Sequence, residues 1–180
     1  MHVDSHILIV YSTIDGHTRK ICQSIQRLLE DYGHQVALLS VEEAIRLDCS
    51  GFDCIVIGAS IRYGKHHPSL YNFIQRHRVT LAALPSAFFS VSGVARNADK
   101  ATRAHNPYFK KFVAQAAWSP QLAAMFGGKI DYAKYRFFDR QMIRFIMWMT
   151  GGPTDLNKPV EFTDWSAVDA FALQIKNLQR

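Results

Sequence analysis

A short segment of small and polar residues separates the first apolar run from a helical pattern, and it consists of Ser12, Thr13, Ile14, Asp15, Gly16, His17 and Thr18. Its hydroxyl groups can donate hydrogen bonds, and Gly16 lets the backbone close around a ligand. The first amides of a helix are unpaired and attract anions. We therefore predict a phosphate-binding loop. The alternative is a polar turn with Asp15 and Gly16 at its tip, because the segment matches neither GxxxxGK[ST] nor GxGxxG.

Two later loops carry further candidate ligands. The first contains Ala59, Ser60, Ile61, Arg62, Tyr63 and Gly64, and the second contains Val91, Ser92, Gly93, Val94 and Ala95. Both follow apolar runs, and the carboxyl ends of parallel strands meet at one sheet edge. Tyr63 could stack on a flat ring whose polar edge bonds backbone amides. Together the three loops predict a site for a planar ring with a phosphate tail. The alternative for Tyr63 is a half-buried surface aromatic.

Cationic side chains accompany these loops. Arg62, Lys65 and Arg96 could hold an acidic substrate through charge-assisted hydrogen bonds. The alternative is that they belong to solvated loops. No catalytic base stands out.

The elements that must position these loops follow from hydrophobic periodicity. Nearly continuous apolar runs of strand length occupy residues 6–11, 35–40, 54–58, 86–91 and 122–127. Helical patterns cover residues 18–32 and 164–178, and others begin at Pro68 and Pro107. Alternating strands and helices predict an α/β fold with a doubly wound, five-stranded parallel sheet in the order 2-1-3-4-5. We expect a single domain over residues 1–180.

A long crossover, residues 131–162, follows the fifth strand and contains its own helical pattern over residues 136–149. Arginines recur there every four positions as Arg136, Arg140 and Arg144. An apolar stripe accompanies them, made of Phe138, Met142, Phe145, Ile146, Trp148 and Met149. A helix with cationic and aromatic-rich faces suits a bilayer interface. The alternatives are packing on its own domain or on a second copy in a homo-oligomer.

The composition of the chain limits the partners, metal sites and location that we expect. The chain has 180 residues, 48% of them hydrophobic, and a net charge of +6, which favours anionic partners. Its basic residues are dispersed, so nucleic acid is not favoured. The three cysteines fit neither a CxxC pair nor a metal site, and we expect no metal. The N-terminus lacks the features of a signal peptide, and no apolar run is long enough to span a bilayer, so we expect an intracellular protein.

The phosphate loop resembles that of the flavodoxin superfamily at Thr13, Gly16 and Thr18, although Asp15 and His17 replace residues that are usual there. The runs VIGASIRYG and YRFFDRQMIRFIM, and the segments GGPTD and FTDW, resemble the menaquinone-linked protoporphyrinogen IX dehydrogenase family of bacterial haem synthesis. This resemblance runs from about residue 7 to 178.

The resemblance implies a flavodoxin-like fold that binds FMN and a six-electron oxidation of protoporphyrinogen IX to protoporphyrin IX. It also implies a quinone, menaquinone or ubiquinone, as acceptor. Because quinones reside in lipid, the crossover helix leads us to expect a peripheral position on the cytoplasmic face of the inner membrane. The basic charge agrees, because electron-carrier flavodoxins are typically acidic and a porphyrinogen carries propionates. The alternative function is a basic electron carrier or regulator that binds a partner protein.

Overall fold

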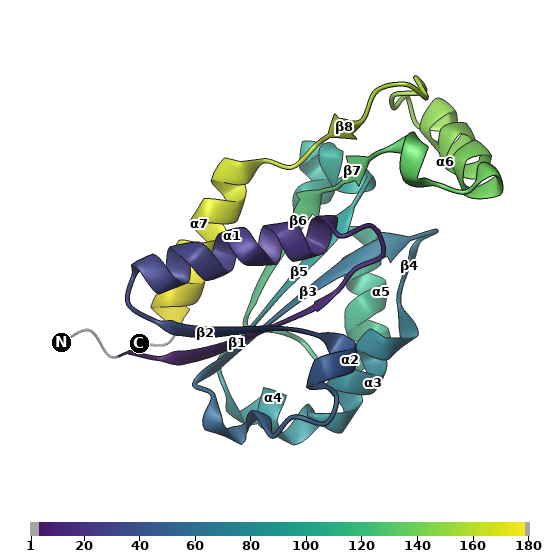
Figure 1. Cartoon of the computed structure of the whole chain (residues 1–180). Coiled ribbons are helices and arrows are strands. Elements are labelled where there is room, and N and C mark those ends of the chain that lie inside the picture. Colours follow the sequence, from purple (N-terminus) through teal and green to yellow (C-terminus); the bar gives the residue numbers. More distant parts are fainter. Residues whose placement is uncertain (1–3, 179–180) are drawn as a thin grey trace.

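The computed structural model describes residues 4–178, in which a parallel sheet forms the centre (Figure 1). Its strands are β1 (His6–Ser12), β2 (Gln35–Ser40), β3 (Cys54–Arg62), β5 (Ser86–Ser92) and β6 (Leu122–Gly127). Their order is β2-β1-β3-β5-β6, which confirms the predicted order of the five apolar runs. Parallel pairing aligns Tyr11 with Gly58, and Ser60 with Val91, so the three predicted loops leave the same sheet edge.

Helices cover both faces of this sheet (Figure 1). One face packs on α1 (His17–Asp31) and α7 (Trp165–Leu178). The other packs on α2 (Val41–Ala44), α3 (Pro68–Arg76), α4 (Arg78–Ala83) and α5 (Pro107–Ala116). Successive strand residues point to opposite faces, so Phe88 stacks on Phe112 of α5 at 4.0 Å between ring centres, whereas Phe89 contacts Phe171 of α7.

Local sequence explains where the main helices begin. Pro68 and Pro107 occupy first-turn positions, where a missing amide hydrogen costs nothing. Asn106 caps α5 by accepting hydrogen bonds from the amides of Tyr108 and Phe109, both at 3.0 Å. Within residues 4–178, the connections also contain four short 3-10 helices, and they are η1 (Cys49–Gly51), η2 (Val94–Arg96), η3 (Ala98–Ala101) and η4 (Tyr132–Lys134).

The crossover carries the predicted helix as α6 (Phe137–Met149), one residue shorter at its start than expected. Three short strands were not predicted: β4 (Lys65–His66), β7 (Lys129–Ile130) and β8 (Val160–Glu161). β4 folds back on β3, and β7 pairs with β8 to fasten the base of the crossover. Its small core is separate from the two main cores and centres on Ile130, Tyr132 and Met147. Figure 1 shows α6 standing away from the sheet at the end of the molecule.

Candidate functional site

A cavity of about 410 Å³ lies at the sheet edge where the three predicted loops end. The first loop contributes Thr13, Asp15, His17 and Thr18. The other two contribute Ser60, Ile61, Arg62, Tyr63, Gly64, Val91, Ser92, Gly93, Val94 and also Arg96. Ser12, Ile14, Gly16, Ala59, Lys65 and Ala95 belong to the same segments but are not part of the cavity lining. The structure thus brings the three loops to one cavity, whereas the ligand that each residue binds stays a prediction.

The first loop presents polar donors toward this cavity. Gly16 adopts a left-handed conformation at φ 82° immediately before α1, and its amide donates to Thr13 Oγ1 at 3.0 Å. Thr18 is 1% exposed, and within residues 4–178 its Oγ1 has no hydrogen-bond partner. Ser92 Oγ, from the third loop, is buried in the same way and also has no partner within the described residues. Buried hydroxyl groups are nearly always paired, so both groups point to a polar ligand.

Asp15 stands beside these donors, where a free carboxylate would repel an anion. Its Oδ2 lies 2.6 Å from Arg62 Nη2 in an ion pair. The Arg62 guanidinium in turn lies over the ring of Tyr135, 4.9 Å from the ring centre. This pairing offsets the negative charge of Asp15 and ties the first loop, the second loop and the crossover together at one point.

His17 links the start of α1 to the segment before α7. Its Nε2 lies 2.6 Å from Thr163 Oγ1, and Thr163 Oγ1 donates to the carbonyl oxygen of Gly127 at 2.7 Å. Because the single hydroxyl hydrogen of Thr163 goes to that carbonyl, Nε2 of His17 must carry a hydrogen and donate it. Nδ1 is then the acceptor atom of the neutral ring. Burial lowers the pKa of His17, with Lys20 and Lys129 adding to the effect and Glu161 opposing it.

The turn that carries Tyr63 is strained. Arg62 pairs with Lys65 across the β3–β4 hairpin, so Tyr63 and Gly64 form its two-residue turn, with φ of 51° and 73°. A tyrosine rarely adopts a positive φ. Its hydroxyl donates to the Asp139 carboxylate of α6, which holds the side chain beside the cavity.

Sequence reasoning missed the wall that the crossover provides. Tyr135, Ile143, Ile146, Met147 and Thr150 line the cavity together with Gly128, Lys129, Ile130 and Tyr108. The spacing of residues 143, 146, 147 and 150 is that of one helix face, a signal the sequence did contain. The pattern could not indicate that this face closes a cavity rather than a core.

Two of the three predicted substrate anchors already have partners within the chain. Arg62 pairs with Asp15, as described above. Arg96 donates through Nη1 to the Gly93 carbonyl at 2.8 Å and through Nη2 to the Thr150 carbonyl at 2.9 Å. Arg96 therefore holds the C-terminal end of α6 against the third loop. Lys65 is exposed on β4. Substrate binding by these three residues stays a prediction.

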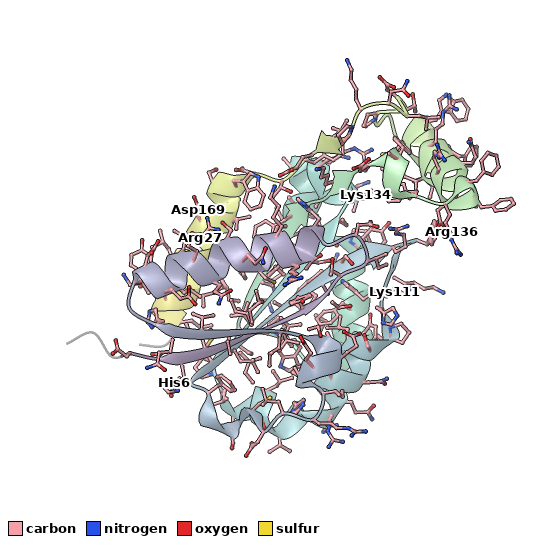
Figure 2. The ribbon with its side chains drawn as sticks, in the orientation of Figure 1. His6, Arg27, Lys111, Lys134, Arg136 and Asp169 are labelled. Atoms are coloured by element: carbon pink, nitrogen blue, oxygen red, sulfur yellow. The ribbon has the colours of Figure 1, made fainter. Side chains whose placement is uncertain are left out.

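The outer face of α6 is apolar and faces solvent. Phe138 is 84% exposed, and Met142, Phe145, Trp148 and Met149 are each more than half exposed. Arg136 and Arg144 are exposed, whereas Arg140 is half-buried and turned toward the packed side. In Figure 2, Arg136 marks the N-terminal end of this helix, and Lys134 lies in η4, which precedes it. A helix of this kind normally buries its apolar face, so α6 presents an uncovered surface.

The possible metal ligands, the cysteines and the lengths of the helices bear on other kinds of site. Within the described part of the chain, no three His, Cys, Asp or Glu side chains gather as metal ligands. Cys22, Cys49 and Cys54 are buried and free, and burial raises the pKa of the Cys54 thiol to about 12. Among residues 4–178, no helix is long and apolar enough to cross a membrane.

Comparison with solved structures supports the fold. A flavodoxin from the domain Archaea aligns with a TM-score of 0.51 and 13% identity over 96% of each chain. A WrbA-like flavodoxin from Agrobacterium tumefaciens aligns with a TM-score of 0.52 and 14% identity over 98% of each chain. These identities are low, so the two likenesses establish the flavodoxin-like fold alone.

Comparison with known sequences identifies the family as well as the fold. Residues 8–157 match the flavodoxin domain family. A Leishmania major protein named protoporphyrinogen IX dehydrogenase [quinone] is 43% identical over 166 residues, 92% of this chain and 72% of its own. The Escherichia coli K12 protein of the same name is 41% identical over 171 residues, 95% of this chain and 94% of its own. The chain therefore belongs to the flavodoxin family and, within it, to the group formed by these quinone-linked protoporphyrinogen IX dehydrogenases.

Proposed function

We propose that this protein is an FMN-dependent oxidoreductase of haem biosynthesis that oxidises protoporphyrinogen IX to protoporphyrin IX with a quinone as acceptor. The observation that carries the proposal is the identity of 41–43% to the two dehydrogenases over nearly the whole chain, crossover included. The reaction balances when protoporphyrinogen IX loses six electrons and six protons and three quinones become three quinols.

The cavity fits FMN. The unpartnered hydroxyl groups of Thr18 and Ser92 and the uncapped start of α1 are donors that a phosphate and a polar ring edge would satisfy. Thr13, Gly16, His17 and Thr18 would surround the phosphate, and the loops after β3 and β5 would hold the ring, with Tyr63 beside it. Bound FMN supplies the two-electron acceptor of the reaction. The protein contributes binding, orientation and exclusion of water.

The rim of the cavity would bind the substrate carboxylates. Arg62, Lys65 and Arg96 stand at or near this rim, and a porphyrinogen carries two propionates. Arg62 and Arg96 would attract a propionate while keeping their internal partners, since a guanidinium has five N–H donors. We assign no side chain as catalytic base.

Membrane binding would bring the enzyme to its acceptor. Quinones reside in lipid, and the outer face of α6 is apolar, while Arg136 and Arg144 on the same helix expose cationic side chains to solvent. Such a helix lies in the interface with its apolar face among the acyl chains. We therefore place the protein peripherally on the cytoplasmic face of the inner membrane. Homo-oligomerisation through the same face is the alternative.

One assay tests the function. The FMN-loaded protein is mixed without oxygen with protoporphyrinogen IX and menadione, and porphyrin fluorescence is followed. We expect fluorescence that rises only when both protein and menadione are present, with three menadiones consumed per porphyrin. An electron carrier would reduce and reoxidise its flavin with other partners but form no porphyrin, and that result would overturn the proposal.

A further inference from the structure

We infer that α6 carries a binding strip for the isoprenoid tail of the quinone, made of Met142, Ile146 and Met149 and running along the helix on both sides of Ile146, at the edge of the cavity. This inference rests on the proposed function, because it takes a quinone as acceptor. It adds a site for the tail that adjoins, at Ile146, the cavity proposed for the reacting rings.

The starting observation is that Ile146 belongs to two surfaces. It lines the cavity together with Ile143 and Met147. It is also 38% exposed, whereas Met147 on the same wall is buried. Ile146 therefore lies where the apolar wall of the cavity passes into the apolar outer face of the helix.

The strip continues along the helix from that point. Met142 and Met149 lie four residues before and three residues after Ile146, so they are its neighbours on the helix surface. Both are exposed, and together the three residues cover about 10 Å of the helix axis. The charged residues Arg140 and Arg144 do not interrupt the strip, because they lie on the other side of the helix.

The chemistry of the strip selects its occupant. Methionine side chains are flexible and adapt to irregular apolar shapes such as a branched polyprenyl chain. A porphyrinogen is a compact ring system with carboxylates and has no long apolar chain to place there. A lipid acyl chain could cover the outer face, but it has no head that enters the cavity. A quinone has both a flat ring and a long apolar tail that extends beyond that ring.

The test compares acceptors with and without a tail. Porphyrin formation is measured in detergent micelles with menaquinone, which carries a polyprenyl tail, and with menadione, which has the same ring system without one. For Ile146→Asn, we expect kcat/KM for menaquinone relative to menadione to fall roughly tenfold, as for the loss of one aliphatic contact. The matched control is Leu173→Asn on α7, where the exposure of 43% is similar and the residue does not line the cavity, and its ratio should equal the parent's.

A second measurement does not depend on turnover. A menaquinone analogue with a photoreactive group in its tail is illuminated with the FMN-loaded parent protein, and labelled peptides are identified. Labelling within residues 142–149 supports the strip, whereas labelling confined to other elements overturns it. An equal loss for both acceptors in Ile146→Asn, or no loss for either, would also overturn it. Porphyrin formation with menadione would stand in either case, so failure of the strip is separable from failure of the proposed function.

Discussion

Replacing Thr18 with valine separates cofactor binding from folding, because the hydroxyl group of Thr18 is buried without a partner in residues 4–178. Valine has nearly the same shape but lacks the hydroxyl, so packing around α1 should be preserved. If Thr18 Oγ1 donates to the FMN phosphate, its loss leaves a phosphate oxygen underbonded and should weaken binding by about 1–3 kcal/mol. This corresponds to a rise in Kd of roughly 5- to 150-fold.

The folding stability of the apo-protein should change in the opposite sense. A buried hydroxyl without a partner is destabilising, so Thr18→Val should leave the free energy of unfolding of the apo-protein unchanged or raise it by up to about 1 kcal/mol. Urea unfolding of the FMN-free protein measures this effect. A clear loss of stability would mean that the hydroxyl has a partner in the folded apo-protein.

The binding assay is fluorescence titration of the apo-protein with FMN and with riboflavin, which lacks the phosphate. We expect Thr18→Val to weaken FMN binding and to leave riboflavin binding unchanged, and Thr18→Ser to retain most of the FMN affinity. Equal weakening for both flavins would refute a contact between Thr18 and the phosphate.

Three further predictions concern other parts of the molecule. His66 is buried against Phe88 and Phe112, and burial lowers its pKa in the folded protein from 6.5 to about 4. Between pH 4 and pH 6.5 the unfolded protein therefore binds more protons at this residue than the folded protein does. The free energy of unfolding should therefore fall by about 3 kcal/mol as the pH drops through this range. In His66→Gln, the free energy measured by urea unfolding should lose most of this pH dependence. Lys65→Ala should raise the KM for protoporphyrinogen IX and weaken the salt dependence of that KM, without affecting FMN binding. Arg62→Ala should raise the same KM and also weaken FMN binding roughly tenfold, because the Asp15 carboxylate is left unpaired. Unchanged steady-state kinetics in both variants would exclude these residues as substrate anchors. Replacing the exposed residues Arg136 and Arg144 by glutamate should release the protein from anionic liposomes in co-sedimentation, at about 1 kcal/mol per arginine, and should slow turnover with lipid-embedded menaquinone more than with menadione. If the parent does not bind these liposomes, or if the double variant binds as well as the parent, α6 is not a membrane-binding helix.

Hydrophobic periodicity was sufficient to predict the sheet, because each strand and helix is encoded by its own local pattern. The five apolar runs became β1, β2, β3, β5 and β6 in the predicted order, and the pattern of the crossover became α6. The convergence of the three loops also followed from sequence, since parallel strands end at one edge. The short strands β4, β7 and β8 were missed because two residues are too few to display a period.

What the local pattern could not provide is the pairing of residues far apart in the chain. Asp15 looked unfavourable beside a phosphate until the fold brought Arg62, 47 positions away, to 2.6 Å from its carboxylate. The hydrogen bond of His17 to Thr163 spans 146 positions. A period of 2 or 3.6 residues reports which face of an element is apolar, but not what meets that face. The sequence by itself therefore determined the elements, their order and the place of the site. Tertiary structure alone decided that α6 turns one face into the cavity and leaves its apolar outer face uncovered, because only long-range packing positions the crossover.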